Sequence, residues 1–148
     1  MRLVVRIPPL LLFVVIVLVM WLGRGEARGA EPLLLPAAAL LLAGALLGGG
    51  ALLHFWRQGT SVHPIRLDQS RVLVTRGVYR ISRNPMYLGL LCWTMALACY
   101  LGGMMVWLGP LLLWGWLTRF QILAEERALH RRFGDAYADY CRRVRRWC

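Results

Sequence analysis

The stretch GVYRISRNPMY, residues 77–87, is a polar and basic segment between two long apolar parts of the chain. Asn84 followed by Pro85 predicts a helix start, because asparagine is favoured at the N-cap and proline is tolerated in the first turn. The two tyrosines and two arginines of the stretch are not needed for a helix start. At a membrane surface such residues often serve as interface anchors and topology signals. The stretch is therefore either an ordinary helix start at a membrane or half of a binding site.

The composition indicates a membrane protein with a single domain, residues 1–148. Of the 148 residues, 59% are hydrophobic, which is too apolar for an ordinary soluble domain of this length. The 18 basic residues are all arginine and outnumber the 7 acids, for a formal net charge of +11. The arginines flank the apolar runs, as in membrane proteins, and no polar domain with interleaved aromatic residues is available to bind bases. Nucleic acid is therefore not an expected partner.

Four apolar runs predict an all-α integral membrane fold with four transmembrane helices, at about residues 7–22, 33–55, 86–101 and 104–120. A cleaved signal peptide is the alternative for the first run, but Arg28 interrupts the small-residue pattern that cleavage needs, so we expect a retained helix. Glycines at 48–50 are expected to admit a closely packed neighbouring helix. Gly102 and Gly103 link the last two runs so tightly that they form an antiparallel hairpin, and Pro110 is expected to kink the fourth helix.

The distribution of arginine predicts the topology. The connection 57–83 and the tail 121–148 are rich in arginine, whereas the loop 23–32 carries two arginines and two glutamates. The positive-inside rule then places both termini, the connection and the tail on the cytoplasmic side. Apolar residues recur in the tail at helical spacing, and Gly134 predicts a bend between two short amphipathic helices.

Glu125 and Glu126 follow the fourth apolar run directly, in a chain with few acids. One interpretation is a solvated helix face on which Glu126 pairs with His130, four residues further on. The other is a ligand contact, because an acid pair at the membrane boundary is costly unless its charge is satisfied. No metal site is expected, since the four cysteines and three histidines fit no zinc spacing.

Both segments match a known pattern. The box Arg83-Asn84-Pro85-Met86-Tyr87, with a downstream Glu125-Glu126, Leu129, Phe133-Gly134, Tyr137, Tyr140 and Val144, resembles the superfamily of isoprenylcysteine carboxyl methyltransferases and phospholipid methyltransferases. Leu73-Val74, Gly77-Val78-Tyr79-Arg80 and Gly59-Thr60 extend the likeness, which covers about residues 55–146 and fits the bacterial branch. The eukaryotic carboxyl methyltransferases usually have histidine at the position of Asn84, which argues against assigning a prenylcysteine substrate.

The resemblance implies S-adenosylmethionine as cofactor, bound at the cytoplasmic surface beneath the helical tail, and methyl transfer to a lipophilic acceptor. The acceptor would be a phospholipid amine, an isoprenylcysteine-like carboxylate or another lipophilic small molecule. Glu126 and Arg119 are the predicted catalytic residues, with Arg119 orienting a carboxylate acceptor. The predicted cofactor-binding residues are Val74, Gly77, Tyr79, Arg83, Asn84, Pro85, Tyr87, Glu125 and Glu126.

The chemistry of these residue types agrees with such a site. Arg83 or Arg80 can bind a carboxylate bidentately, and either glutamate can accept hydrogen bonds from an amino group or from ribose hydroxyls. Tyr79 or Tyr87 can offer an aromatic face to the sulfonium. If the acceptor is an amine, a base must remove a proton, and His54 and His63 are only weak candidates. The rival hypothesis, a non-enzymatic four-helix scaffold or small-molecule carrier, explains the apolar runs but does not require both segments.

Overall fold

The computed structural model describes residues 7–27, 31–57 and 73–148, and these residues form helices and connections without a strand. The predicted α-helical class is therefore confirmed. The main helices are α1 (Pro9–Leu22), α2 (Leu34–Arg57), α3 (Pro85–Leu101), α4 (Leu108–Trp116) and α5 (Leu123–Arg143). Short 3-10 helices are η1 (Gly23–Ala27), η3 (Gly77–Arg80) and η4 (Met105–Trp107), and η5 (Leu117–Ile122) is a π-helix.

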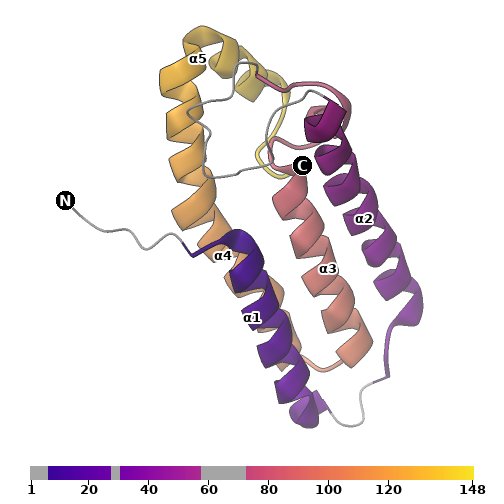
Figure 1. Cartoon of the computed structure of the whole chain (residues 1–148). Helices are drawn as coiled ribbons and strands as arrows, with labels where there is room; N and C mark the ends of the chain where they lie inside the picture. Colours follow the sequence, from indigo (N-terminus) through magenta and orange to yellow (C-terminus); the bar gives the residue numbers. More distant parts are fainter. Residues whose placement is uncertain (1–6, 28–30, 58–72) are drawn as a thin grey trace, which may run out of the picture.

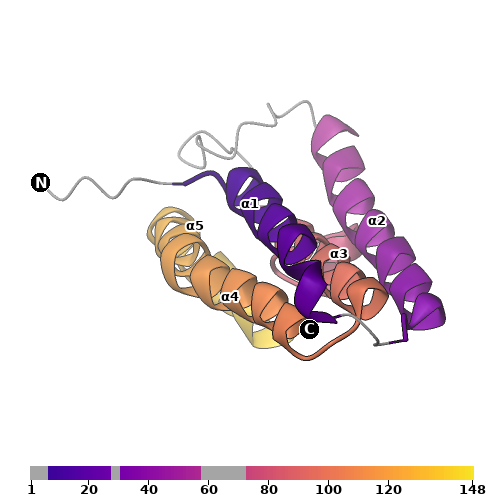
Figure 2. The same ribbon diagram turned by 90° about the horizontal axis from the view of Figure 1, so that it is seen from below.

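Helices α1 to α4 alternate in direction, and α3 lies against the other three (Figure 1). Seen from below, α2 and α4 flank α3 on opposite sides, and α1 lies next to α3 between α2 and α4 (Figure 2). The end of α2, the start of α3 and the whole of α5 lie at one end of the molecule (Figure 1). The described part of the predicted connection, residues 73–83, lies at the same end as the tail, as the sequence predicts.

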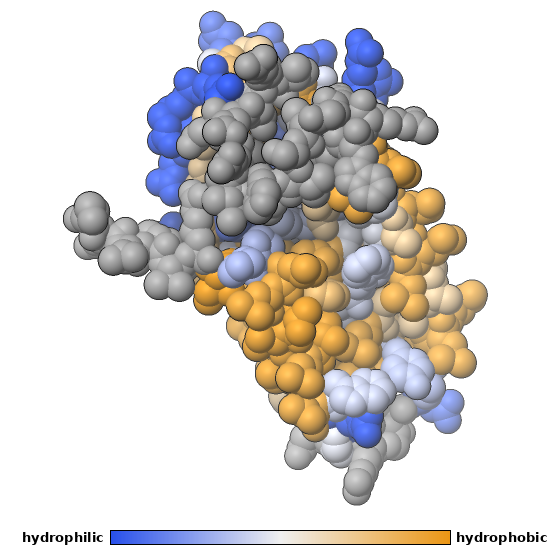
Figure 3. Space-filling view, viewed as in Figure 1, coloured by the Kyte–Doolittle hydropathy of each residue, from blue (hydrophilic) through white to orange (hydrophobic). Residues whose placement is uncertain are grey.

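The apolar surface lies on the helices below that end. Hydrophobic residues cover the visible faces of α1 and α2, while hydrophilic residues gather around α5 (Figure 3). Among the described residues, the segment Leu34–His54 is long and apolar enough to cross a membrane, and the apolar segments Pro9–Gly25 and Pro85–Leu101 are shorter. Four membrane-spanning helices therefore remain a prediction, with one supported by length and composition.

Pro110 does not kink the fourth helix, contrary to the sequence-based prediction. Residues 105–107 form a 3-10 turn instead, so α4 begins at Leu108 and Pro110 lies in its first turn. The first backbone N–H groups of a helix have no intrahelical acceptor, so proline costs little there. The predicted end of the helix at residue 120 is also wrong, because the helix continues through η5 into α5.

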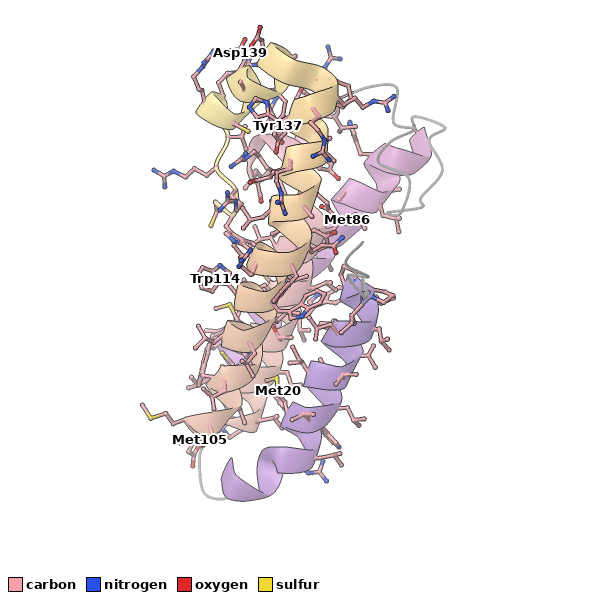
Figure 4. The ribbon with its side chains drawn as sticks, turned by 90° about the vertical axis from the view of Figure 1, so that its left-hand side faces the viewer. Met20, Met86, Met105, Trp114, Tyr137 and Asp139 are labelled. Atoms are coloured by element: carbon pink, nitrogen blue, oxygen red, sulfur yellow. The ribbon has the colours of Figure 1, made fainter. Side chains whose placement is uncertain are left out.

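The tail behaves as its pattern predicts. Gly134 has φ 50° and ψ −122° and divides α5 into two helical parts. The apolar residues of the tail pack together in a cluster whose buried members are Tyr137, Tyr140 and Val144. Tyr137 lies on the inner side of α5, whereas Asp139 is exposed at its outer end (Figure 4).

Helices α2 and α3 approach closely where Gly44 and Gly48 of α2 meet Gly89 of α3, so of the predicted glycines 48–50 it is Gly48 that admits the neighbouring helix. A Cβ at Gly89 would lie 3.0 Å from the carbonyl oxygen of Gly44 and 3.2 Å from the nitrogen of Gly48. Trp93 packs over Gly44 and donates a hydrogen bond to the carbonyl of Leu41 at 3.2 Å. Two glycines four residues apart on α2 thus let the backbones meet.

We expect Gly89→Leu to destabilise the protein by about 2 kcal/mol, because an overpacked contact between two backbones cannot relax by a rotamer change. Gly49→Leu is the matched control, since no atom lies within 4 Å of the Cβ position at Gly49. Thermal unfolding in detergent measures both. Equal melting temperatures for the two variants would contradict the close contact.

Candidate functional site

The segment before α3 is held in place by the tail. Gly77 has φ +64°, in the left-handed region that favours glycine, and it begins η3 three residues after the half-buried Val74. Tyr79 is buried, and its carbonyl accepts a hydrogen bond from the hydroxyl of Tyr140 at 2.7 Å. Burial raises the pKa of Tyr79 above its ordinary value and that of Tyr140 to about 12, so both phenols stay protonated at neutral pH.

Asn84 occupies the N-cap of α3 as predicted, but its side chain makes no capping hydrogen bond. Its amide Nδ2 instead donates to the carbonyl of Arg146 at 3.0 Å. The backbone N–H of Asn84 donates to Oγ of the buried Ser82 at 3.1 Å. Pro85 is buried at the first helical position. Asn84 therefore joins the helix start to the C-terminal end of the chain.

Arg83 and Glu126 form an ion pair between the start of α3 and α5. The distance from Arg83 Nη1 to Glu126 Oε1 is 3.3 Å, and the two side chains are only 13% and 16% exposed. Arg83 Nη1 also donates to the hydroxyl of Tyr137 and to Sγ of Cys141. Burial raises the pKa of Tyr137 above its ordinary value, so its hydroxyl stays neutral beside the ion pair.

Glu125 points to a different set of partners. Its Oε1 accepts a hydrogen bond from the hydroxyl of Tyr87 at 2.6 Å and another from Nε2 of Gln121. Gln121 is buried at the end of the π-helix η5, four residues before Glu125. The predicted contact between residues 77–87 and the acid pair is confirmed, and each glutamate meets a different residue of that stretch.

A partner that the sequence analysis missed is Arg146. Its Nε and Nη2 bind the two carboxylate oxygens of Glu126 at 2.9 and 2.7 Å. These hydrogen bonds raise the pKa of Arg146 above its ordinary value. The hypothesis that Glu126 lies on a solvated face and pairs with His130 is wrong. No spacing in the sequence distinguishes Arg146 from the other arginines of the tail.

We call residues 144–147 the C-terminal segment. Main-chain and side-chain hydrogen bonds fix it against the start of α3. The backbone N–H of Arg83 donates to the carbonyl of Arg145 at 3.1 Å, and Oγ of Ser82 donates to the carbonyl of Arg146 at 3.2 Å. Trp147 packs against the core cluster of Leu113, Leu117 and Ile122, where Tyr87 also packs.

Other candidate residues lie outside this cluster. Arg119 is exposed on η5, and no hydrogen bond or ion pair joins it to the cluster in the described part of the chain. Arg80 is exposed, so Arg83 is the arginine of the stretch that meets the acids. The ring of His54 lies 6.4 Å from that of Tyr79. His63 and the pair at 59–60 lie outside the described residues.

Comparisons with known proteins agree with the pattern. A sequence model of the family described as phospholipid methyltransferase matches residues 34–136. An uncharacterized protein of Haemophilus influenzae is 42% identical over 62 residues, which are 42% of this chain and 98% of that protein. Protein-S-isoprenylcysteine O-methyltransferase B of Arabidopsis thaliana is 30% identical over 71% of this chain and 53% of its own length. The corresponding protein of Schizosaccharomyces pombe is 28% identical over 73% of this chain and 46% of its own length.

The chain therefore belongs to the phospholipid methyltransferase family, within the superfamily that includes the isoprenylcysteine methyltransferases. The matched region contains both the stretch 77–87 and the acid pair. The chain spans about half the length of the isoprenylcysteine methyltransferases that it matches. No solved structure gives a significant match.

We expect Glu126→Gln to lower the free energy of unfolding by about 2 kcal/mol, because the substitution leaves two arginines without their counter-charge. Breaking a fully buried pair costs about 3–5 kcal/mol, and the 36% exposure of Arg146 reduces the loss here. Asp139→Asn is the control, since its pair with Arg142 is exposed and such pairs contribute about 0–1 kcal/mol. Chemical unfolding in detergent checks both. A smaller loss of unfolding free energy for Glu126→Gln than for Asp139→Asn would contradict the part-buried ion pairs of Glu126.

Proposed function

We propose that this protein is an integral-membrane methyltransferase that uses S-adenosylmethionine to methylate a lipophilic acceptor. The observation that supports it best is the convergence of Arg83 and Tyr87 with Glu126 and Glu125 at one end of the helical bundle. A carrier needs apolar helices but does not need a part-buried set of charges and aromatic groups at one end. Membership of a methyltransferase family supports the same choice.

The residues of this end fit the polar groups of the cofactor. Arg83 is a cation for a carboxylate, and Glu125 is an acceptor for an amino group or ribose hydroxyls. Two donors are buried there without a hydrogen-bond partner among the described residues, Nε of Arg83 and Nε1 of Trp147. Buried donors are normally paired, so a ligand rich in acceptor atoms would complete them.

Bound S-adenosylmethionine supplies a methyl group that is activated by the adjacent sulfonium. The task of the protein is then to hold the two reactants in line, since positioning alone can remove several kcal/mol from the barrier of a bimolecular step. Tyr79 and Tyr87 stand beside the acid pair, where an aromatic face stabilises a cation. The hydrogen bond from Tyr87 to Glu125 fixes the ring of Tyr87 relative to α5.

The site would lie at the cytoplasmic surface of four membrane-spanning helices, with both termini on that side, in the bacterial inner membrane. The arginines at this end and the apolar surfaces of α1 and α2 support that orientation (Figure 3). The acceptor would enter from the bilayer and be a phospholipid amine or an isoprenylcysteine-like carboxylate. Arg119, exposed on η5, would orient a carboxylate acceptor.

Calorimetry in detergent tests the cofactor site. We expect Arg83→Ala, Glu125→Ala and Glu126→Ala each to weaken S-adenosylmethionine binding at least tenfold, because each removes a charged hydrogen-bonding group, worth about 1.5–3 kcal/mol. Arg142→Ala is the control, since its side chain is exposed and its ion pair among the described residues is with Asp139. Unchanged affinity in all three variants would remove the site as proposed.

Methyl transfer is tested with labelled S-adenosylmethionine and bacterial lipid extract. We expect label to enter the lipid fraction with the wild type. Arg119→Ala should reduce kcat/KM for a carboxylate acceptor about tenfold while leaving an amine acceptor unaffected, because only the carboxylate needs a guanidinium partner. If no extract accepts label and no cofactor binds, the carrier hypothesis replaces this one.

A further inference from the structure

The charges around Glu126 do not balance. Two guanidinium groups, those of Arg83 and Arg146, share this one carboxylate. Glu125 is next in sequence but turns its Oε1 to Tyr87 and Gln121. The acids further along α5, Asp135 and Asp139, are exposed. Among the described residues, the part-buried cluster of Arg83, Arg146 and Glu126 therefore carries one positive charge more than its carboxylate neutralises.

The two arginines are held together by backbone contacts as well as by the ion pairs. The N–H of Arg83 is bound to the carbonyl of Arg145, and the carbonyl of Arg146 accepts from Ser82 and Asn84. These contacts place the C-terminal segment beside Arg83 whatever the state of Glu126. The mutual repulsion of the guanidinium groups is thus overcome by the fold, which is the arrangement expected of a preformed anion site.

Arg83 also has unused capacity to donate. A guanidinium carries five N–H donors, and in Arg83 the hydrogen bonds run from Nη1 to Tyr137 and Cys141. Its Nε is buried and has no partner in the described part of the chain. A second oxyanion next to Glu126 would satisfy this donor and the surplus charge together.

We propose that Arg83 and Arg146 form an anion subsite that takes the carboxylate of a bound ligand, with Glu126 holding the two guanidinium groups in place. Arg146, from the C-terminal segment, is the new member of the site. The inference rests on the proposed function, and the carboxylate belongs either to the methionine part of the cofactor or to the methyl acceptor. The recognition chemistry is the same for both, namely charge-assisted hydrogen bonds from two guanidinium groups.

The test deletes the carboxylate from the ligand and the guanidinium from the protein. Calorimetry compares S-adenosylmethionine with its decarboxylated form, for the wild type, Arg146→Gln and Arg146→Lys. We expect Arg146→Gln to weaken binding of S-adenosylmethionine at least tenfold and binding of the decarboxylated form less than twofold. Arg146→Lys should lose an intermediate amount of affinity for S-adenosylmethionine. Arg143→Gln is the control, because Arg143 is exposed and, within the described part of the chain, donates to the carbonyl of Asp139 in its own helix.

A second arm identifies the source of the carboxylate. It compares binding of N-acetyl-S-farnesylcysteine and its methyl ester to the same variants. A loss confined to the free acid, with both cofactor forms unchanged, assigns the subsite to the acceptor. Equal losses of affinity for ligands with and without the carboxylate, or no loss in either arm, would overturn the inference. A purely structural Arg146 would not discriminate between the two forms of a ligand. A wild type that binds neither cofactor form would instead overturn the proposed function itself.

Melting curves separate these outcomes from misfolding. Arg146→Lys keeps the positive charge beside Glu126, so it should unfold close to the wild type. Its ligand selectivity then reports on the subsite even if Arg146→Gln is destabilised.

Discussion

One carboxylate, that of Glu126, connects three parts of the chain that are distant in sequence. Arg83 precedes α3, Glu126 lies in the first turn of α5, and Arg146 follows the end of α5. The contact is largely shielded from water, so its charges are screened less than those of an exposed pair. The ion pairs add to the backbone hydrogen bonds that hold the C-terminal segment against the start of α3, and Tyr137 is buried beside Arg83.

The neighbouring residues Glu125 and Glu126 contact different partners because of helix geometry. Successive residues of an α-helix point about 100° apart, so Glu125 and Glu126 cannot face the same partner. Glu125 reaches Tyr87 on α3, and Glu126 reaches the two arginines. A single turn of α5 therefore contacts both the helical bundle and the C-terminal segment. This explains how so small a chain can enclose a polar region beside apolar helices.

The sequence predicted the helical class, the bend at Gly134, and the placement of the stretch 77–87 and the acid pair at the same end of the molecule. These features depend on periodicity, on charge distribution and on glycine, which act locally or over whole segments. It mispredicted Pro110, since the start of α4 is decided by the 3-10 turn before it. It missed Arg146, one of four arginines in the last seven residues. The backbone becomes extended at Val144, with φ −128° and ψ 131°, and this change directs Arg146 toward Glu126. Val144 is buried in the cluster with Tyr137 and Tyr140, so the change follows from tertiary packing.

The π-helix η5 changes which side chains face inward along the continuous helical run from α4 to α5. Wider turns accommodate one additional residue in an otherwise continuous helix, which offsets everything downstream by roughly 100° about the axis. Leu113 before η5 and Leu117 at its start pack in the apolar core, whereas Gln121 near its end and Glu125 beyond it are hydrogen bonded to each other at the polar end. The continuous helical run from α4 to α5 thereby presents apolar side chains to the interior at one level and polar side chains at the next.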